Sequence, residues 1–102
     1  MTARSTIDEL RNALRPVFQR APVYRAVLFG SYAAGCATEQ SDIDLVIDSR
    51  GELLGLPFFG VLEDVSSVLG KPVDMFEVSE IRTGSPMAET IAKRGVVLYE
   101  RT

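Results

Sequence analysis

Apolar residues recur at helical spacing in three stretches of the chain. The first covers residues 5–15, where Ser5 is suited to cap the first turn. Pro16 lacks an N–H and is expected to kink or end this helix. The second stretch, residues 57–69, has proline in its first turn and is followed by a glycine. The third opens at Ser85–Pro86, a capping residue followed by proline, and should reach residue 93 or 94.

Four short apolar or alternating runs predict β-strands between these helices. They cover residues 24–29, 42–47, 72–78 and 96–99. The alternation of helices and strands predicts an α+β (α/β-like) fold, with a small mixed sheet flanked by helices. About a dozen residues join the first two strands, so the pattern leaves antiparallel and mixed pairing open.

Composition favours one globular domain, residues 1–102, since 46% of the residues are hydrophobic and 25% are charged. The chain has no histidine, which excludes Ser-His-Asp hydrolases, Cys-His proteases and His-ligated zinc sites. Its one cysteine, Cys36, excludes an internal disulfide and favours a cytoplasmic location.

Charge and hydropathy limit the possible partners. The formal net charge is −3, so the chain lacks the basic character typical of nucleic-acid binders, and we expect no direct DNA binding. The longest mostly apolar stretch, residues 53–62, is too short to cross a bilayer, so we expect no membrane partner.

Two carboxylates stand at the start of the second predicted strand. Asp42 and Asp44 are two residues apart, so in a strand they point to the same face with Cα atoms roughly 6.6 Å apart. Like charges this close repel unless a cation lies between them, and carboxylate oxygens are ligands that Mg²⁺ prefers. A solvated strand end carrying two acids is the alternative, and an Asp-x-Asp pair alone favours that simpler reading.

A third acid changes this balance. Asp74 lies inside an apolar strand, where an acid is uncommon unless it is paired or metal-bound, and it can aim at the same point if the third strand neighbours the second. An edge-strand acid facing water is the alternative. Glu77 should point to the opposite face and is expected to be the solvated one of the two. Asp48 shares the face of Asp42 and Asp44 but lies about 13 Å along the strand from Asp44, too far for the same ion.

A glycine and a serine follow the first predicted strand directly. Gly30 allows a phosphate or another backbone to approach closely, and Ser31 offers a hydroxyl near backbone N–H groups. A turn glycine followed by a helix-capping serine is the simpler alternative. Together with the three carboxylates, this corner would provide what metal-dependent nucleotidyl transfer requires, a chemistry that needs no histidine.

The segment LFGSYAAGCATEQSDIDLVI resembles the signature of the DNA polymerase β-like nucleotidyltransferase superfamily, in which Gly-Ser is followed by about ten residues and Asp-x-Asp. The small size, the acid in PVDMFEV and the ending IAKRGVVLYE are similar to the minimal nucleotidyltransferases, or MNT proteins. The resemblance spans roughly residues 27–100. It implies the nucleotidyltransferase fold for this chain.

The resemblance also implies roles for individual residues. Gly30 and Ser31 correspond to contacts with the nucleotide phosphates, Asp42 and Asp44 to ligands of both Mg²⁺ ions, and Asp74 to the third carboxylate, on the catalytic metal. It further implies ATP as substrate and a HEPN-domain toxin as partner. In characterised pairs of that kind, the MNT protein is the antitoxin and transfers AMP to a tyrosine of the toxin.

The chain departs from the family pattern at one position. Where the family commonly has Gly-Ser-x-Ala-Arg-Gly, Ala34 replaces the arginine, which removes a charge and a bidentate phosphate contact. Arg82 and Lys71 are candidates to compensate, whereas Tyr32 is expected to be a packing or edge residue. The departure leaves open an antitoxin that only binds its toxin. Transfer to a small molecule is a weaker alternative, because the chain is shorter than enzymes with a further acceptor-binding domain.

The apolar stretch at residues 53–62 bears on the partner question. It carries more apolar groups than one helix face can bury: Leu53, Leu54, Leu56, Phe58 and Phe59. An exposed partner-binding surface and a fully buried helix start are equally compatible with the sequence.

Overall fold

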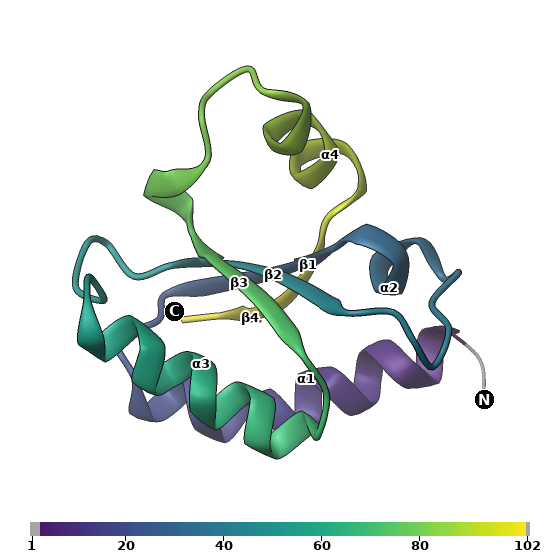
Figure 1. Ribbon diagram of the computed structural model, residues 1–102, viewed down its shortest axis with the longest axis horizontal. Helices are drawn as coiled ribbons and strands as arrows, with labels where there is room; N and C mark the ends of the chain where they lie inside the picture. Colours follow the sequence, from purple (N-terminus) through teal and green to yellow (C-terminus); the bar gives the residue numbers. More distant parts are fainter. Residues whose placement is uncertain (1–2, 102) are drawn as a thin grey trace.

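The computed structural model describes residues 3–101, with side chains from Ile7 onward. The first helix begins at Ala3, two residues before the predicted start, and the Ser5 side chain lies outside the described part. Figure 1 shows a four-stranded sheet with helices on both faces. The elements in chain order are α1 (Ala3–Arg20), β1 (Arg25–Phe29), α2 (Gly30–Ala34), β2 (Ile43–Asp48), α3 (Leu56–Leu69), β3 (Val73–Glu77), the 3₁₀ turn η1 (Val78–Glu80), α4 (Pro86–Arg94) and β4 (Val96–Glu100). The predicted α+β class is confirmed.

The sheet is mixed, with strand order β3-β2-β1-β4. The central strand β1 is antiparallel to both β2 and β4, whereas β2 and β3 run parallel. Parallel neighbours need a crossover connection, and α3 supplies it. The pairing of the first two strands, which the sequence left open, is therefore antiparallel. β2 and β3 form the parallel pair.

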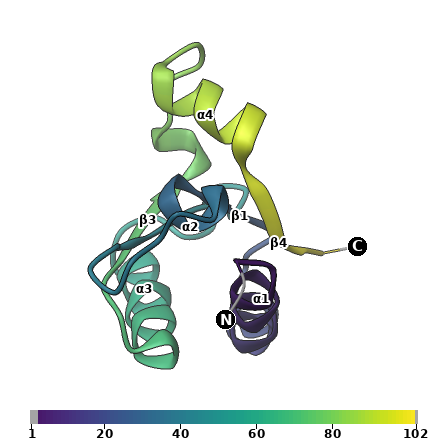
Figure 2. The same ribbon diagram turned by 90° about the vertical axis from the view of Figure 1, so that its right-hand side faces the viewer.

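Helices α1 and α3 cover one face of the sheet, and α4 with η1 lies over the other (Figures 1 and 2). The short helix α2 caps the end of the sheet where β1 finishes. We call the face under α1 and α3 the closed face, and the face under α4 the open face. On the closed face, a continuous core includes Leu14, Phe18, Leu28, Leu45 and Ile47, all fully buried.

Of the two outcomes expected at Pro16, a kink or an end of the helix, the end is wrong. The helix continues to Arg20 with Pro16 inside it. Pro16 is exposed, while Val17 and Phe18 beyond it are buried against the sheet. Burial of the apolar face after the proline offsets the lost backbone hydrogen bond, so packing overrides the local signal.

The open face is covered by a smaller apolar cluster. Val27, Phe29 and Val46 are buried there, with half-buried Ile91 of α4 packed on them. The predicted start of α4 is confirmed, because the Ser85 hydroxyl accepts a hydrogen bond from the Ala88 N–H at 3.1 Å. Within residues 3–101, no helix is both long and apolar enough to cross a membrane.

Candidate active site

The turn after β1 requires glycine. Gly30 has a φ of 75°, a left-handed conformation that side chains disfavour, and a Cβ added there would lie 2.2 Å from Oδ2 of Asp44. The backbone of Gly30 therefore lies directly against the Asp44 carboxylate. This close approach joins the glycine–serine corner after β1 to the carboxylate of Asp44.

Ser31 occupies the second position of α2, immediately beyond this corner. The helix has five residues, so its macrodipole contributes little, and the local polar groups are its first backbone N–H groups and the serine hydroxyl. The Ser31 carbonyl accepts a hydrogen bond from the Cys36 N–H at 3.1 Å, which closes the turn after the helix.

Three carboxylates lie together on the open face beside this corner. In the parallel register Asp44 is paired with Asp74, and in the antiparallel register Asp44 is paired with Phe29, the residue before Gly30. Asp42 precedes Asp44 by two residues, at the head of β2. Asp44 is half-buried, whereas Asp42 and Asp74 are exposed. The sheet thus places Asp44 against Gly30, with Asp74 beside Asp44 on the neighbouring strand and Asp42 two residues before it.

The electrostatics agree with this grouping. Burial raises the pKa of the Asp44 carboxyl, and the neighbouring charges of Asp74 and Asp42 raise that pKa further. Among the described side chains, no cation offsets this negative charge at Asp44. A divalent cation would relieve this repulsion.

We tested whether these residues suit Mg²⁺. Their chemistry fits, because carboxylate oxygens are preferred ligands and Asp44 is destabilised as an anion by its two acidic neighbours. As they stand, no three Asp, Glu or Cys side chains within residues 7–101 are already gathered as a ligand set. The side chains would have to turn toward a shared ion, which the exposure of Asp42 and Asp74 permits.

The expectation that Glu77 is solvated is wrong. It points to the closed face, as predicted from strand alternation, but only 2% of its surface is exposed. Its carboxylate accepts hydrogen bonds of 2.8 Å from the Ser49 N–H, the Ser49 hydroxyl and the Ser79 N–H. Burial alone would raise the pKa of Glu77, but the hydrogen bonds from Ser79 and Ser49 outweigh it and lower the pKa. Glu77 is therefore a buried structural anion that fixes the turns after β2 and β3.

The two candidate cations occupy different places. Lys71, just before β3, donates a hydrogen bond to the hydroxyl of Tyr32 in α2. Arg82 is exposed in the segment between η1 and α4. Ala34 is exposed at the end of α2, so the position of the family's arginine faces solvent. Lys71 and Tyr32 are 39 positions apart, so no local sequence pattern indicates that their side chains are hydrogen-bonded.

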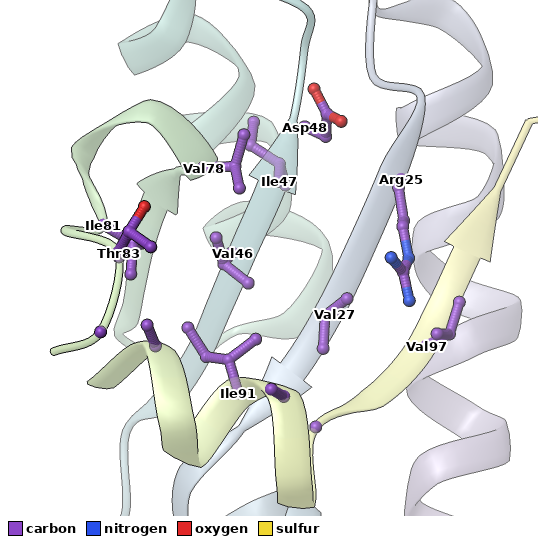
Figure 3. A pocket seen from close by; sticks show the side chains of 14 residues that line it. Arg25, Val27, Val46, Ile47, Asp48, Val78, Ile81, Thr83, Ile91 and Val97 are labelled. Atoms are coloured by element: carbon purple, nitrogen blue, oxygen red, sulfur yellow. The ribbon is translucent and has the colours of Figure 1, made fainter. Parts of the chain in front are cut away.

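A groove of about 490 Å³ lies on the open face beyond the carboxylates, between the sheet and α4 (Figure 3). Its floor includes Val27 and Val46, which are paired with each other. This pair lies on the same face as the pair Phe29 and Asp44, two residues further along the strands. Arg25 and Asp48 stand at the far end, with Ile91 on the wall formed by α4. Asp48 therefore shares the face of the carboxylates at a distance, as expected.

The mixed sheet and its polar corner agree with the class of enzymes that transfer nucleotidyl groups. The chain belongs to the nucleotidyltransferase domain family, whose model matches residues 7–98. The resemblance inferred from the residues is thereby confirmed, and with it the assignment to nucleotidyltransferase enzymes.

One curated relative is similar over almost its entire length. The protein adenylyltransferase MntA of Thermococcus cleftensis is 30% identical over 98 residues, which make up 92% of this chain and 97% of the relative. Its name connects the family to protein adenylyltransferase activity.

Solved structures share the fold at lower identity. A chain of a toxin–antitoxin crystal structure with AMP-PNP matches with a TM-score of 0.76 and 20% identity, over 90% of this chain and 74% of that chain. A chain of the complex of tri-AMPylated Shewanella oneidensis HEPN toxin with MNT antitoxin matches with a TM-score of 0.70 and 18% identity, over 93% and 73% respectively. At these identities the likeness concerns the fold alone.

Proposed function

We propose that this chain, acting as one domain over residues 1–102, is a Mg²⁺-dependent adenylyltransferase. It would transfer AMP from ATP to a hydroxyl of a partner HEPN toxin and thereby act as the antitoxin. The observation that carries the proposal is the placement of Asp44 between Asp74 in the parallel register and Gly30 at close approach. Three carboxylates and a glycine–serine corner in one place suit a triphosphate and its metal ions.

Each residue has a role in this proposal. Gly30 and Ser31 bind the phosphates, since the glycine lets them approach the backbone and the serine offers its hydroxyl. Asp42 and Asp44 hold both metal ions, and Asp74 is the third ligand. When bound, Mg²⁺ would neutralise the triphosphate and stabilise charge at the acceptor and leaving oxygens. The chain's own residues orient the nucleotide and fix the position of the ligand set.

A HEPN toxin as partner is supported by two observations. One matched complex contains a HEPN toxin, and the relative with 30% identity is named a protein adenylyltransferase. The chain also exposes apolar side chains around the start of α3, where Leu56 is 85% exposed, Leu54 62% and Phe59 61%. Such a cluster is typical of a protein-binding surface. Cytoplasmic location is part of the same proposal, because Cys36 is an exposed free thiol.

An antitoxin that neutralises by binding alone is the second candidate. The exposed Ala34 favours it, because the family's arginine charge is missing beside the phosphate corner. Transfer of AMP to a small molecule, such as an antibiotic, is a third and weaker candidate.

The decisive experiment incubates the chain with labelled ATP, Mg²⁺ and the HEPN protein encoded beside it. We expect label on the toxin, and we expect the Asp42→Asn/Asp44→Asn variant to reduce the transfer by about a thousandfold or more. Asp48→Asn is the matched control, since it removes a carboxylate from the same strand and face beyond the reach of the site. It should keep wild-type transfer.

The outcomes separate the candidates. No label on the toxin, or equal label from the double variant, would reject transfer by these carboxylates. If the double variant still neutralises the toxin in cells while wild type transfers nothing, binding alone is the function. Pyrophosphate released with small acceptors but not with the toxin would favour the third candidate.

A further inference from the structure

Lys71 contacts two of the three segments that build the proposed site and belongs to the third. Its ammonium group donates a hydrogen bond to the Tyr32 hydroxyl in α2 and lies 5.1 Å from the centre of the Tyr32 ring. It also reaches the Glu39 carbonyl at 3.5 Å, in the loop between α2 and β2. Lys71 itself stands two residues before β3. One side chain thus joins α2, the following loop and the entry to β3.

Each proposed site residue lies close in sequence to one of these contacts. Ser31 is adjacent to Tyr32, Asp42 follows Glu39 by three residues, and Asp74 follows Lys71 by three residues. The backbone strengthens the same junction, because the Ile43 N–H donates to the Pro72 carbonyl at 3.2 Å. A shift of Lys71 would therefore be transmitted to the phosphate corner and to the carboxylates together.

Asp74 is held by the pairing of β3 with β2, whereas among the described residues α2 and the loop after it have fewer restraints. Helix α2 has five residues and no side-chain cap, so it cannot hold its own orientation by helix propensity. Within the described side chains, the loop at residues 35–42 is tied mainly by short-range hydrogen bonds between Thr38 and Ser41. Tyr32 packs against the closed-face core, which gives the ammonium group a fixed partner. Lys71 is half-buried, so its position is restricted as well.

We propose that Lys71 is a positioning residue for nucleotidyl transfer, acting through the Tyr32 hydroxyl and the Glu39 carbonyl to hold Ser31, Asp42 and Asp74 in register. The inference rests on the proposed function for its catalytic consequence. This role differs from that of the arginine that Ala34 replaces, because Lys71 would hold protein segments in place and would not bind the phosphates. The ammonium group is needed because it can donate to two oxygens at once, the Tyr32 hydroxyl and the Glu39 carbonyl.

The test measures transfer to the toxin with kcat and the KM for ATP determined separately. We expect Lys71→Met to lower kcat about ten- to a hundredfold, the effect of a misplaced reacting group, with the KM for ATP changed less than about threefold. Lys71→Arg keeps a cation and its donors, so it should recover most of the rate. Lys93→Met is the matched control, because it removes the exposed lysine of α4. It should behave as wild type.

Tyr32→Phe tests the route of the effect. It keeps the ring and removes the hydroxyl, so it should lower kcat in part and add little in combination with Lys71→Met. Wild-type kcat in Lys71→Met or in Tyr32→Phe would overturn the proposal. A raised KM for ATP at unchanged kcat in Lys71→Met would also overturn it, because Lys71 would then bind the nucleotide directly.

A second measurement does not depend on activity. We expect backbone amides of residues 31–42 to exchange hydrogen at least about fivefold faster in Lys71→Met, with the unfolding midpoint close to that of wild type. Unchanged exchange would overturn the positioning role. If wild type transfers nothing to any acceptor, the proposed function fails, and the exchange result still decides whether Lys71 orders these segments.

Discussion

The two faces of the sheet are built from the same strands, but the closed face carries the core and the open face carries the candidate active site. On β2, Ile43, Leu45 and Ile47 point into the closed core, while Asp44 and Asp48 lie on the open face. Strand alternation makes this division automatic, since successive residues point to opposite faces. The difference teaches that stability and chemistry are separated residue by residue along one strand. Changes in the closed-face core should affect folding, and changes to the carboxylates beside Gly30 on the open face should affect transfer.

The largest stability effect should come from truncation in the closed core. Phe18 is fully buried and packs near Tyr99, with ring centres 5.6 Å apart. We expect Phe18→Ala to lower the free energy of unfolding by about 3–5 kcal/mol, from lost burial and the cavity left behind. Ile91→Ala on the open face should cost less than about 2 kcal/mol, because Ile91 is half-buried. Urea unfolding of both variants checks this, and equal costs would contradict the division between the faces.

An intermediate effect should come from two acids with opposite pKa shifts. Glu77 on the closed face has a lowered pKa, so the stability it contributes is present above its ordinary value of 4.5 and is lost as the pH falls through its folded value. We expect Glu77→Gln to cost about 1–3 kcal/mol at pH 7, because the two buried donors of Ser49 and the N–H of Ser79 lose their anionic acceptor. The cost should shrink below pH 4.5.

Asp44 on the open face should show the reverse sign. Its raised pKa means that the ionised form is disfavoured in the folded protein, and this penalty disappears as the pH falls through the raised value toward 3.8. Asp44→Asn should therefore be at least as stable as wild type at pH 7, with the difference vanishing in acid. Thermal unfolding across this pH range measures both variants. A destabilised Asp44→Asn at neutral pH would show that the carboxylate cluster is not repulsive.

The smallest effect should come from adding one methyl group to glycine. Gly30→Ala places a Cβ against the Asp44 carboxylate and forces a left-handed φ, so we expect a loss of about 1–2 kcal/mol together with impaired transfer. Gly60 lies inside α3, and its added Cβ would meet nothing within 4 Å. Gly60→Ala should stabilise by about 0.5–1 kcal/mol and leave transfer unchanged. Unfolding midpoints and transfer rates of the pair, measured together, decide the point.

Much of the fold could be predicted because its signals are local. The residues around Ser85 and Gly95 mark the limits of α4 directly, and the short apolar runs mark the strands. The end of α1 could not be predicted, since Pro16 is tolerated only because Val17 and Phe18 are buried beyond it. The stabilisation that outweighs the proline comes from tertiary packing, and a single stretch of sequence does not show this packing.

The candidate site shows the same limit. The spacing of Asp42 and Asp44 predicted a shared face, but their proximity to Asp74 depended on which strand pairs with β2. Glu77 was wrongly expected in solvent, because its hydrogen-bond donors come from Ser49, which is 28 positions away. Long-range pairing of polar groups, as between Lys71 and Tyr32, leaves no periodic trace along the chain.

The order of the sheet puts β3 at one margin, where its outer backbone groups have no strand beside them. Such a margin is a template onto which another chain can add, and a short strand with a charge discourages this. β3 has five residues with Asp74 second among them and exposed. The same carboxylate that faces Asp44 therefore keeps separate molecules from joining into a continuous sheet, so an apolar residue at this position would favour aggregation.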